Sequence, residues 1–378
     1  MKSGKTTASL LNKLLQDELR PRFAGAVEKL YVNDYSSPPF ATLVDITTKC
    51  NLNCPWCIDQ YALSDKEIPT KRMLTLLEEF KDLNILSIVY FGGGEPLFHE
   101  GVKEILEKTQ RLEIDYALNT NGILLHRALS VIAESCSWSR VSWDAADPVV
   151  YREMHRNMDL FGKILENTED LAKHAKGTVG VSFVVMQANI GEIHKAAKLV
   201  KNIGCNFVQF KPRYTPLESN KRVLDYYDDE TSTIVKEELV KAQEEENDNF
   251  AVLITGSLKA VLDKKPINQN KTYTYCAAQQ FITLINPCGV YICPNWRGAQ
   301  GKSVGNVLTN SLAKIWQSQK RREVINSLNP SKECELNCLR HDTNVLISAL
   351  LRAKSMGLDL LSHIQETRGE EISDRYFL

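Results

Sequence analysis

The feature that most constrains this chain is a run of three cysteines, Cys50-Asn51-Leu52-Asn53-Cys54-Pro55-Trp56-Cys57, directly after the apolar, strand-like run 41–46. Thiolates at C-x3-C-x2-C spacing can wrap a tight loop around one face of a four-iron, four-sulfur cluster. Such a loop leaves the fourth iron without a protein ligand. Structural zinc is the rival interpretation, but zinc usually takes four protein ligands, and the next histidine after the run is His99.

The bulk composition narrows the compartment and the partners. The chain has ten cysteines, and its first 23 residues carry Lys and Arg without the apolar core of a signal peptide. Clustered cysteines in a reducing cytosol are more often metal-binding or catalytic than disulfide-bonded. Lys+Arg 46 and Asp+Glu 47 leave a net charge of -1. We therefore expect a cytoplasmic protein with no nucleic-acid partner and no membrane partner.

Strand-like and helical patterns alternate along the chain, which predicts an α/β fold. Apolar runs at 41–47, 85–91, 114–119, 139–143, 178–186 and 206–211 are separated by amphipathic helical stretches. Six β/α units imply a parallel sheet with right-handed crossovers. Polar and glycine-rich motifs follow the first four runs: the cysteines, Gly93-Gly94-Glu95-Pro96, Asn119-Thr120-Asn121-Gly122 and Ser142-Trp143-Asp144. Carboxyl ends of parallel strands are where α/β barrels build their sites.

These four motifs together resemble those of radical S-adenosylmethionine (SAM) enzymes. The resemblance implies a partial (β/α)6 barrel and a 4Fe-4S cluster held by Cys50, Cys54 and Cys57. It implies that the open iron chelates SAM, whose cleavage by one electron gives a 5′-deoxyadenosyl radical that removes a hydrogen atom from the substrate. A low-potential electron donor such as flavodoxin or ferredoxin is implied as a partner.

The same resemblance suggests which residues contact SAM. The candidates are Trp56, Gly93, Gly94, Glu95, Asn119, Asn121, Ser142 and Asp144. A carboxylate such as Glu95 suits the cationic amino group of the methionine moiety. For the Asn and Asp residues, capping of a turn is an equally good explanation. Trp56 either lies near the adenine or covers the cluster from water.

A second cysteine set lies in the last third of the chain. Cys276, a predicted β-hairpin around Pro287-Cys288-Gly289, Cys293, Cys334 and Cys338 resemble the SPASM/twitch extension of radical SAM enzymes. Four thiolates, Cys276, Cys293, Cys334 and Cys338, suffice for one auxiliary 4Fe-4S cluster. Cys288 or His341 could replace one of them. Zinc is the rival metal, because Cys334-x3-Cys338-x2-His341 has acceptable zinc spacing.

The predicted organisation has five parts. They are an N-terminal helical segment (1–40), the partial barrel (41–213), a charged helical connection (214–250), a small α+β twitch/SPASM-like domain built on a β-hairpin and helices (251–341), and a C-terminal helix (342–378). The last helix either packs back on the barrel or joins subunits. The first part is too short for the winged-helix domain that many radical SAM peptide maturases carry.

We therefore expect a radical SAM oxidoreductase that acts on an unactivated C–H bond of a small polar metabolite, of the sugar or aminocyclitol type. In that scheme the auxiliary cluster accepts an electron or anchors the substrate. The alternative is a peptide maturase that cross-links, epimerises or oxidises a ribosomal peptide. A remote alternative is a zinc-stabilised binding module without chemistry. No proton acceptor is identified.

Substrate contacts are predicted weakly, from position alone. The candidates are Arg152, Lys211, Arg213, Tyr214 and Arg297. Arg152, His155 and Arg156 fall within about one helical turn and form either an anion site or a solvated basic face.

Overall fold

The structure is a computed structural model. It describes residues 19–155, 159–216, 222–265, 271–299, 301–334, 338 and 340–359. The part of the expected N-terminal helical segment before residue 19, Arg156, and the part of the expected C-terminal helix from 360 onward lie outside the described residues.

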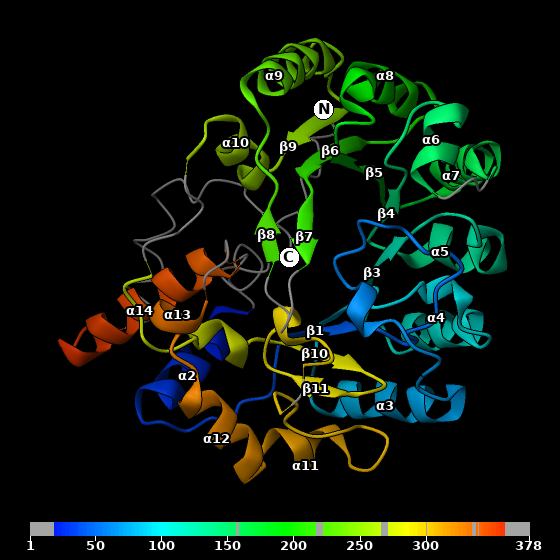
Figure 1. The fold of residues 1–378 in the computed structure, drawn as a ribbon. Coiled ribbons are helices and arrows are strands. Elements are labelled where there is room, and N and C mark those ends of the chain that lie inside the picture. Colours follow the sequence, from blue (N-terminus) through cyan, green and yellow to red (C-terminus); the bar gives the residue numbers. More distant parts are fainter. Residues whose placement is uncertain are drawn as a thin grey trace.

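A single curved sheet of nine strands organises the molecule (Figure 1), in the order β11-β10-β1-β2-β3-β4-β5-β6-β9. All neighbouring strands in it are parallel except β10 and β11. The strands are β1 Ala41–Val44, β2 Ser87–Tyr90, β3 Asp115–Thr120, β4 Trp138–Ser142, β5 Thr178–Val185, β6 Phe207–Pro212, β9 Ala251–Ile254, β10 Ile282–Asn286 and β11 Gly289–Tyr291. The α/β class and the six expected strands are confirmed.

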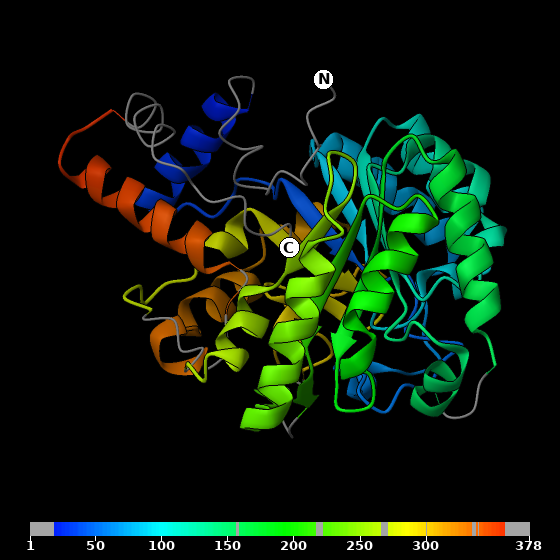
Figure 2. The same cartoon turned by 90° about the horizontal axis from the view of Figure 1, so that it is seen from above.

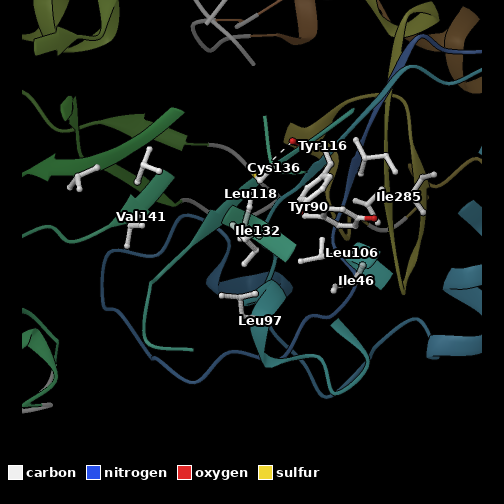
Figure 3. Close-up of a cluster of buried hydrophobic side chains, with 14 of the residues drawn as sticks. Ile46, Tyr90, Leu97, Leu106, Tyr116, Leu118, Ile132, Cys136, Val141 and Ile285 are labelled. Atoms are coloured by element: carbon white, nitrogen blue, oxygen red, sulfur yellow. Dashed lines mark hydrogen bonds between the residues drawn. The ribbon is translucent and has the colours of Figure 1, made fainter. Parts of the chain in front are cut away.

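Helices cover the outer face of this sheet. They are α3 Thr70–Asp82, α4 Val102–Arg111, α5 Leu129–Ser135, α6 Pro148–Met154, α7 Phe161–His174, α8 Ile193–Asn202 and α9 Asp229–Gln243. Their apolar stripes meet every second residue of the strands, because successive side chains of a strand point to opposite faces. Figure 3 shows part of this core, where Leu118 of β3 lies near Ile132 of α5. Tyr90 is also fully buried, and its hydroxyl pairs with Thr109 of α4 at 2.6 Å.

The sheet runs across two of the predicted domain boundaries. β9, which begins the expected auxiliary domain, pairs with β6 of the barrel. The expected hairpin is present as β10 and β11, and β10 pairs with β1 in the register Ala41↔Ile282. The second cysteine region is therefore attached to the barrel through continuous backbone hydrogen bonds. The five-part division itself stays a prediction.

The charged segment 214–250 is more than a helical connection. It begins with the antiparallel ribbon of β7 (Tyr214–Pro216) and β8 (Arg222–Leu224), and its helix α9 then packs beside α8. The helix α9 leads into β9, which pairs with β6. The segment therefore adds one more helix-and-strand unit to the curved sheet. The charged residues at its start cap the helix: Asp228 accepts a hydrogen bond from the Thr231 backbone N–H at 2.7 Å.

The C-terminal helix α14 (His341–Ser355) packs against α2 (Arg20–Tyr31), and both views show the two side by side (Figures 1 and 2). Lys354 and Glu28 form an ion pair between them at 2.8 Å. Three further short helices, α11 Leu312–Trp316, α12 Gln319–Ser327 and α13 Pro330–Glu333, and α10 Gly256–Leu262 complete the described helices. None of the helices in the described ranges is both long and apolar enough to cross a bilayer.

Candidate functional site

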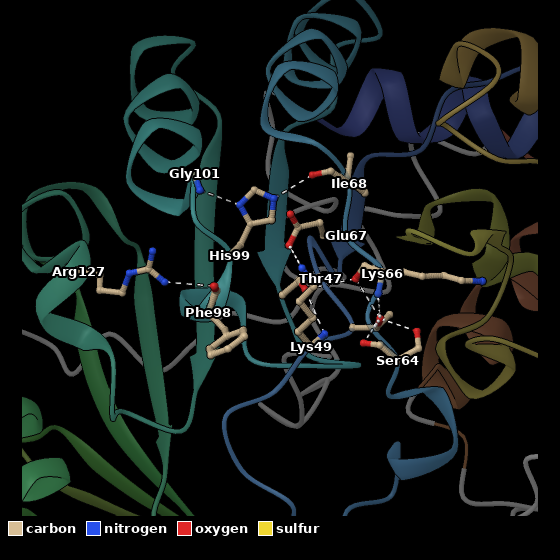
Figure 4. Close-up of polar contacts among 11 residues, drawn as sticks. Thr47, Lys49, Ser64, Lys66, Glu67, Ile68, Phe98, His99, Gly101 and Arg127 are labelled. Carbon is tan, nitrogen blue, oxygen red and sulfur yellow. Dashed lines mark hydrogen bonds and ion pairs between the residues drawn. The ribbon is translucent and has the colours of Figure 1, made fainter.

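The three cysteines of the first set lie in one loop that follows β1, and all three are half-buried. The loop is held at its base by polar contacts, several of which Figure 4 shows. The Lys49 carbonyl accepts from the Glu95 N–H at 2.8 Å, and the Thr48 hydroxyl lies 2.9 Å from the Ser64 carbonyl oxygen. Burial raises the pKa of Cys50 to about 11, so in the apo-protein this thiol stays protonated at neutral pH.

Glu95 is the carboxylate that ties the second and third strand ends together. It is buried, and it accepts hydrogen bonds from the Thr120 hydroxyl at 2.6 Å and from the backbone N–H groups of Asn121 at 2.7 Å and Leu97 at 3.1 Å. Burial nevertheless outweighs these bonds and raises the pKa of Glu95 to about 7. Its preceding glycine has a packing role: a Cβ on Gly94 would lie 2.3 Å from the Lys49 carbonyl oxygen.

The amide and hydroxyl candidates occupy two different places. Asn121 donates from its side chain to Asn51 of the cysteine loop at 2.8 Å, so it joins the third strand end to that loop. Asn119 lies earlier on β3, where its side-chain oxygen accepts from Arg140 at 2.8 Å. Ser142 is half-buried at the end of β4, on the same face of that strand as Arg140.

Asp144 closes the site from the fourth strand end. It has φ = +58°, a left-handed backbone that Asp tolerates better than most residues, and its carboxylate accepts from the Val184 N–H at 2.8 Å. The indole N–H of Trp56 donates to the other carboxylate oxygen at 3.4 Å. Trp56 therefore links the cysteine loop to the end of β4.

His155 lies in this site, whereas the sequence leaves it in either an anion site or a solvated basic face. Instead of a solvated basic face, the imidazole is buried, with Nδ1 3.4 Å from the Cys54 sulfur. Its ring stacks on Tyr151 at a centroid distance of 4.1 Å and meets Trp56 edge-on at 4.9 Å. The sequence signal was present, because Tyr151 and His155 are spaced i, i+4 and share one face of a helix.

Arg297 lies in a different place from the one expected of a substrate contact. It is buried, and its guanidinium donates to Asp45 at 2.6 Å and to Asp59 at 2.6 Å. Both of its carboxylate partners are buried as well. Arg297 therefore joins the segment after β11 to the end of β1 and to the cysteine loop, and its ion-pairing groups are occupied by the chain itself.

The four remaining weak candidates do not form one group. Arg152 is exposed on α6, and Arg213 pairs with Asp225 at 3.2 Å. Tyr214 is half-buried at the start of β7. Lys211 is half-buried on β6, and the charges of Arg140, Asp144 and Cys57 are near enough to influence its pKa. Of the four, Lys211 is the one whose electrostatic neighbours belong to the site.

The four thiols expected to hold an auxiliary cluster lie close enough to interact electrostatically. Cys276, Cys293, Cys334 and Cys338 are near enough that the negative charge of one thiolate raises the pKa of others. Burial is the larger cause and raises the pKa of Cys334 to about 12 and that of Cys338 to about 12. Cys288 does not take part in these interactions. Its charge instead contributes to the raised pKa of Tyr291. His341 has its Nδ1 3.1 Å from the Tyr273 hydroxyl.

Both cysteine sets fit iron–sulfur clusters in their chemistry. Buried thiols with raised pKa values bind metal only as thiolates, and several cationic irons in one cluster compensate several thiolates at once. Within the described ranges, no three His, Cys, Asp or Glu side chains are close enough to share a single metal ion.

Two family models match the chain. The model described as the radical SAM superfamily matches residues 44–200, and the model described as an iron–sulfur cluster-binding domain, SPASM, matches residues 276–339. The first match spans the cysteine loop and the Glu95, Asn121 and Asp144 turns. The second spans all four thiols of the auxiliary set.

Two curated relatives align with parts of the chain. A GTP 3′,8-cyclase of Alkaliphilus oremlandii is 30% identical over 181 residues, which cover 45% of this chain and 55% of that protein. A PqqA peptide cyclase of Gluconobacter oxydans is 35% identical over 91 residues, which cover 24% of this chain and 25% of that protein. The chain thus spans about half the length, or less, of the curated relatives it matches.

Solved structures share the fold over most of the chain. Streptococcus suis SuiB bound to its precursor peptide SuiA has a TM-score of 0.63 at 18% identity, covering 82% of this chain and 72% of SuiB. The protein anSMEcpe with bound AdoMet and a peptide has a TM-score of 0.56 at 19% identity, covering 76% of this chain and 83% of that one. With the fold, both family models and both thiol sets in agreement, the chain belongs to the radical SAM superfamily and carries a SPASM-type iron–sulfur cluster-binding domain.

Proposed function

We propose that this protein is a radical SAM enzyme that modifies a peptide. The radical part of the proposal is carried by one observation: the loop of Cys50, Cys54 and Cys57 is surrounded by polar groups from three further strand ends, of which Glu95 and Asp144 are buried carboxylates. When bound, the cluster and SAM supply a 5′-deoxyadenosyl radical that removes a hydrogen atom from the substrate.

The residues of this chain then have separate tasks. Cys50, Cys54 and Cys57 would hold the cluster and leave one iron open to the amino and carboxylate groups of SAM. Glu95 provides negative charge at the second strand end, where the ammonium of SAM would bind. Trp56, hydrogen-bonded to Asp144, shields the loop from water on the side of β4. The auxiliary thiols would hold a second cluster around the β10–β11 hairpin, whose strand β10 pairs with β1.

A peptide substrate has more support than the small sugar-like metabolite expected from the sequence. One relative is a PqqA peptide cyclase, and two proteins of the same fold, SuiB and anSMEcpe, are solved with bound peptides. The comparisons supply no support for a sugar or aminocyclitol substrate. We therefore replace that expectation with the peptide alternative. The candidate net reactions are cross-linking, epimerisation and oxidation of the peptide.

A second candidate is a nucleotide substrate, which the 30% identity to GTP 3′,8-cyclase favours. That similarity covers 45% of the chain and 55% of the cyclase, so more than half of this chain lies outside it.

The test is anaerobic reconstitution with iron and sulfide, followed by reduction in the presence of SAM. We expect 5′-deoxyadenosine, and a mass change in an added peptide drawn from a library of short peptides. GTP is the comparison substrate in a parallel reaction. Cleavage of SAM with no peptide change but with turnover of GTP would reject the peptide, and a protein that binds zinc without sulfide and cleaves no SAM would reject the radical chemistry itself.

A further inference from the structure

The inner face of the sheet, opposite the helices, is layered. Its lowest layer is an apolar group of buried side chains, Leu43, Val89, Ala117, Trp138, Leu284 and Tyr291, which come from β1, β2, β3, β4, β10 and β11. The register pairs Ala117 with Trp138 and, two residues further on, Asn119 with Arg140. Because side chains alternate between faces, Asn119 and Arg140 stand directly above the apolar layer.

The layer above is polar and only half-buried. Arg140 and Ser142 of β4, Asn119 of β3, and Gln209 and Lys211 of β6 share this face. The residues between them on the same strands, Leu118, Val141, Val208 and Phe210, are fully buried under the helices. This layer thus lies between the apolar layer and the strand ends that carry the cysteine loop and Asp144.

Two cations dominate the polar layer, and neither is neutralised by a carboxylate in it. Arg140 donates to two neutral amide oxygens, those of Asn119 and Gln209, each at 2.8 Å, and its guanidinium lies 5.7 Å from the Trp138 ring. Lys211 makes no hydrogen bond or ion pair with any described residue. The side-chain N–H2 of Asn119 and the hydroxyl of Ser182 are buried in the same region without a partner in the described structure.

Keeping these two cations buried costs free energy unless an anion pairs with them. Burial lowers the pKa of Lys211 to about 8 and that of Arg140 to about 10, yet both side chains remain charged at pH 7. The charge of Asp144 acts on Lys211 and raises its pKa, but the Asp144 carboxylate already accepts hydrogen bonds from the Val184 N–H and the Trp56 indole N–H. Buried charges in proteins are paired or serve a ligand.

We infer that Arg140 and Lys211 bind a carboxylate of the substrate, so that the peptide enters the site with an Asp or Glu side chain. Asn119 and Ser182 supply further donors to the same group. The identification of the ligand as a peptide rests on the proposed function. The evidence for a carboxylate site comes from the polar layer alone. In this arrangement, side chains of β4 and β6 select the substrate. SAM would bind at the strand ends above them.

The experiment uses the reconstituted protein with SAM and two probes. The first is a random hexapeptide library with both ends capped, so that side chains are its only carboxylates. The second is glutaramate, the monoamide of glutarate, titrated calorimetrically. We expect the wild type to enrich Asp- or Glu-containing peptides and to bind glutaramate. Arg140→Gln and Lys211→Gln should each weaken glutaramate binding about tenfold or more and remove the acidic enrichment, as loss of a buried charge-assisted hydrogen bond predicts.

Three controls make the result decisive. Lys198→Gln, an exposed lysine on α8, makes the same change outside the layer and should alter neither probe. Arg140→Lys should restore part of the binding. Cluster absorbance and the circular dichroism spectrum establish that each variant is folded.

The outcomes separate this inference from the proposed function. Glutaramate binding that depends on both cations, without enrichment of any peptide, would keep the carboxylate site and reject the peptide. Acidic enrichment that persists in both variants would overturn the inference and keep the peptide. Loss of SAM affinity in both variants, with the probes unaffected, would assign the cations to the carboxylate of SAM and would also overturn it.

Discussion

The sulfur of Cys54 lies 3.4 Å from Nδ1 of His155, within hydrogen-bond reach of a buried imidazole. Hydrogen bonds to cluster sulfurs and the polarity of the surroundings set the reduction potential of iron–sulfur clusters. An N–H group withdraws electron density from the thiolate and stabilises the reduced cluster. We therefore expect His155 to raise the reduction potential of the first cluster by donating Nδ1–H to the Cys54 sulfur.

We expect His155→Phe to make the midpoint potential of the first cluster more negative, because the variant keeps the ring stacking but loses the N–H donor. A redox titration followed by electron paramagnetic resonance measures this. Tyr151→Phe is the matched control, since the Tyr151 hydroxyl has no partner among the described residues. An unchanged potential in a His155→Phe protein with intact cluster would contradict the assignment.

Glu95 predicts a pH dependence of stability in the cluster-free protein. Its pKa is raised from the ordinary value of 4.5 to about 7, so the folded state binds the proton more tightly than the unfolded state does. The stability from this group is complete below about pH 4.5 and is lost as pH rises through 7. Glu95→Gln should show a flatter profile between pH 5 and pH 8, by up to about 3 kcal/mol. Urea unfolding across this range measures it, and parallel profiles would contradict it.

At the scale of elements, the buried Arg297 joins three pieces of chain. It lies after β11 and the short turn 294–296, while Asp45 follows β1 and Asp59 ends the cysteine loop. The close approach of Gly93 adds to this junction, because a Cβ there would lie 2.9 Å from Cδ of Arg297. The ion pairs thus connect the auxiliary domain to the loop that would hold the first cluster.

Arg297→Met should destabilise the protein by about 3–5 kcal/mol, because it leaves two buried carboxylates without a cation. The thermal unfolding midpoint measures the effect. Arg322→Met, at an exposed arginine of α12, is the control and should have almost no effect. Adding Asp45→Asn and Asp59→Asn to Arg297→Met should recover part of the loss. If the triple variant is less stable than Arg297→Met alone, the charge argument fails.

At the scale of the whole molecule, one curved sheet connects two thiol sets. The first set follows β1, and Cys276 and Cys293 flank the β10–β11 hairpin that pairs with β1. Both sets are therefore held on adjacent strands, with Cys334 and Cys338 brought in by the segment between α13 and α14. This arrangement predicts two clusters that can be removed separately.

We expect about eight irons and eight sulfides per reconstituted chain. Cys334→Ala should lower both to about four and leave SAM cleavage measurable, whereas Cys54→Ala should abolish cleavage. Cys205→Ala, at a buried thiol in the outer core, should change neither count nor cleavage and is the matched control. Loss of all cleavage in a folded Cys334→Ala protein would contradict the division into two independent clusters.

The strand-ending motifs and the two cysteine sets can be identified from the sequence, because both depend on local spacing. The period-two pattern of 138–142 also puts Arg140 and Ser142 on one face of a strand, but that pattern alone does not mark Arg140 as a binding residue. The six expected strands follow from the same local periodicities, with ends shifted by a few residues at most.

Only the tertiary structure decided which distant residues meet. His155 and Cys54 are 101 residues apart, Arg297 and Asp45 are 252 apart, and Arg140 and Gln209 are 69 apart. Such pairs depend on strand order and register, and no local pattern encodes them. The parallel pairing of β10 with β1 likewise joins residues 41–44 to residues 282–285, and with them the segments that carry the two thiol sets, in one sheet.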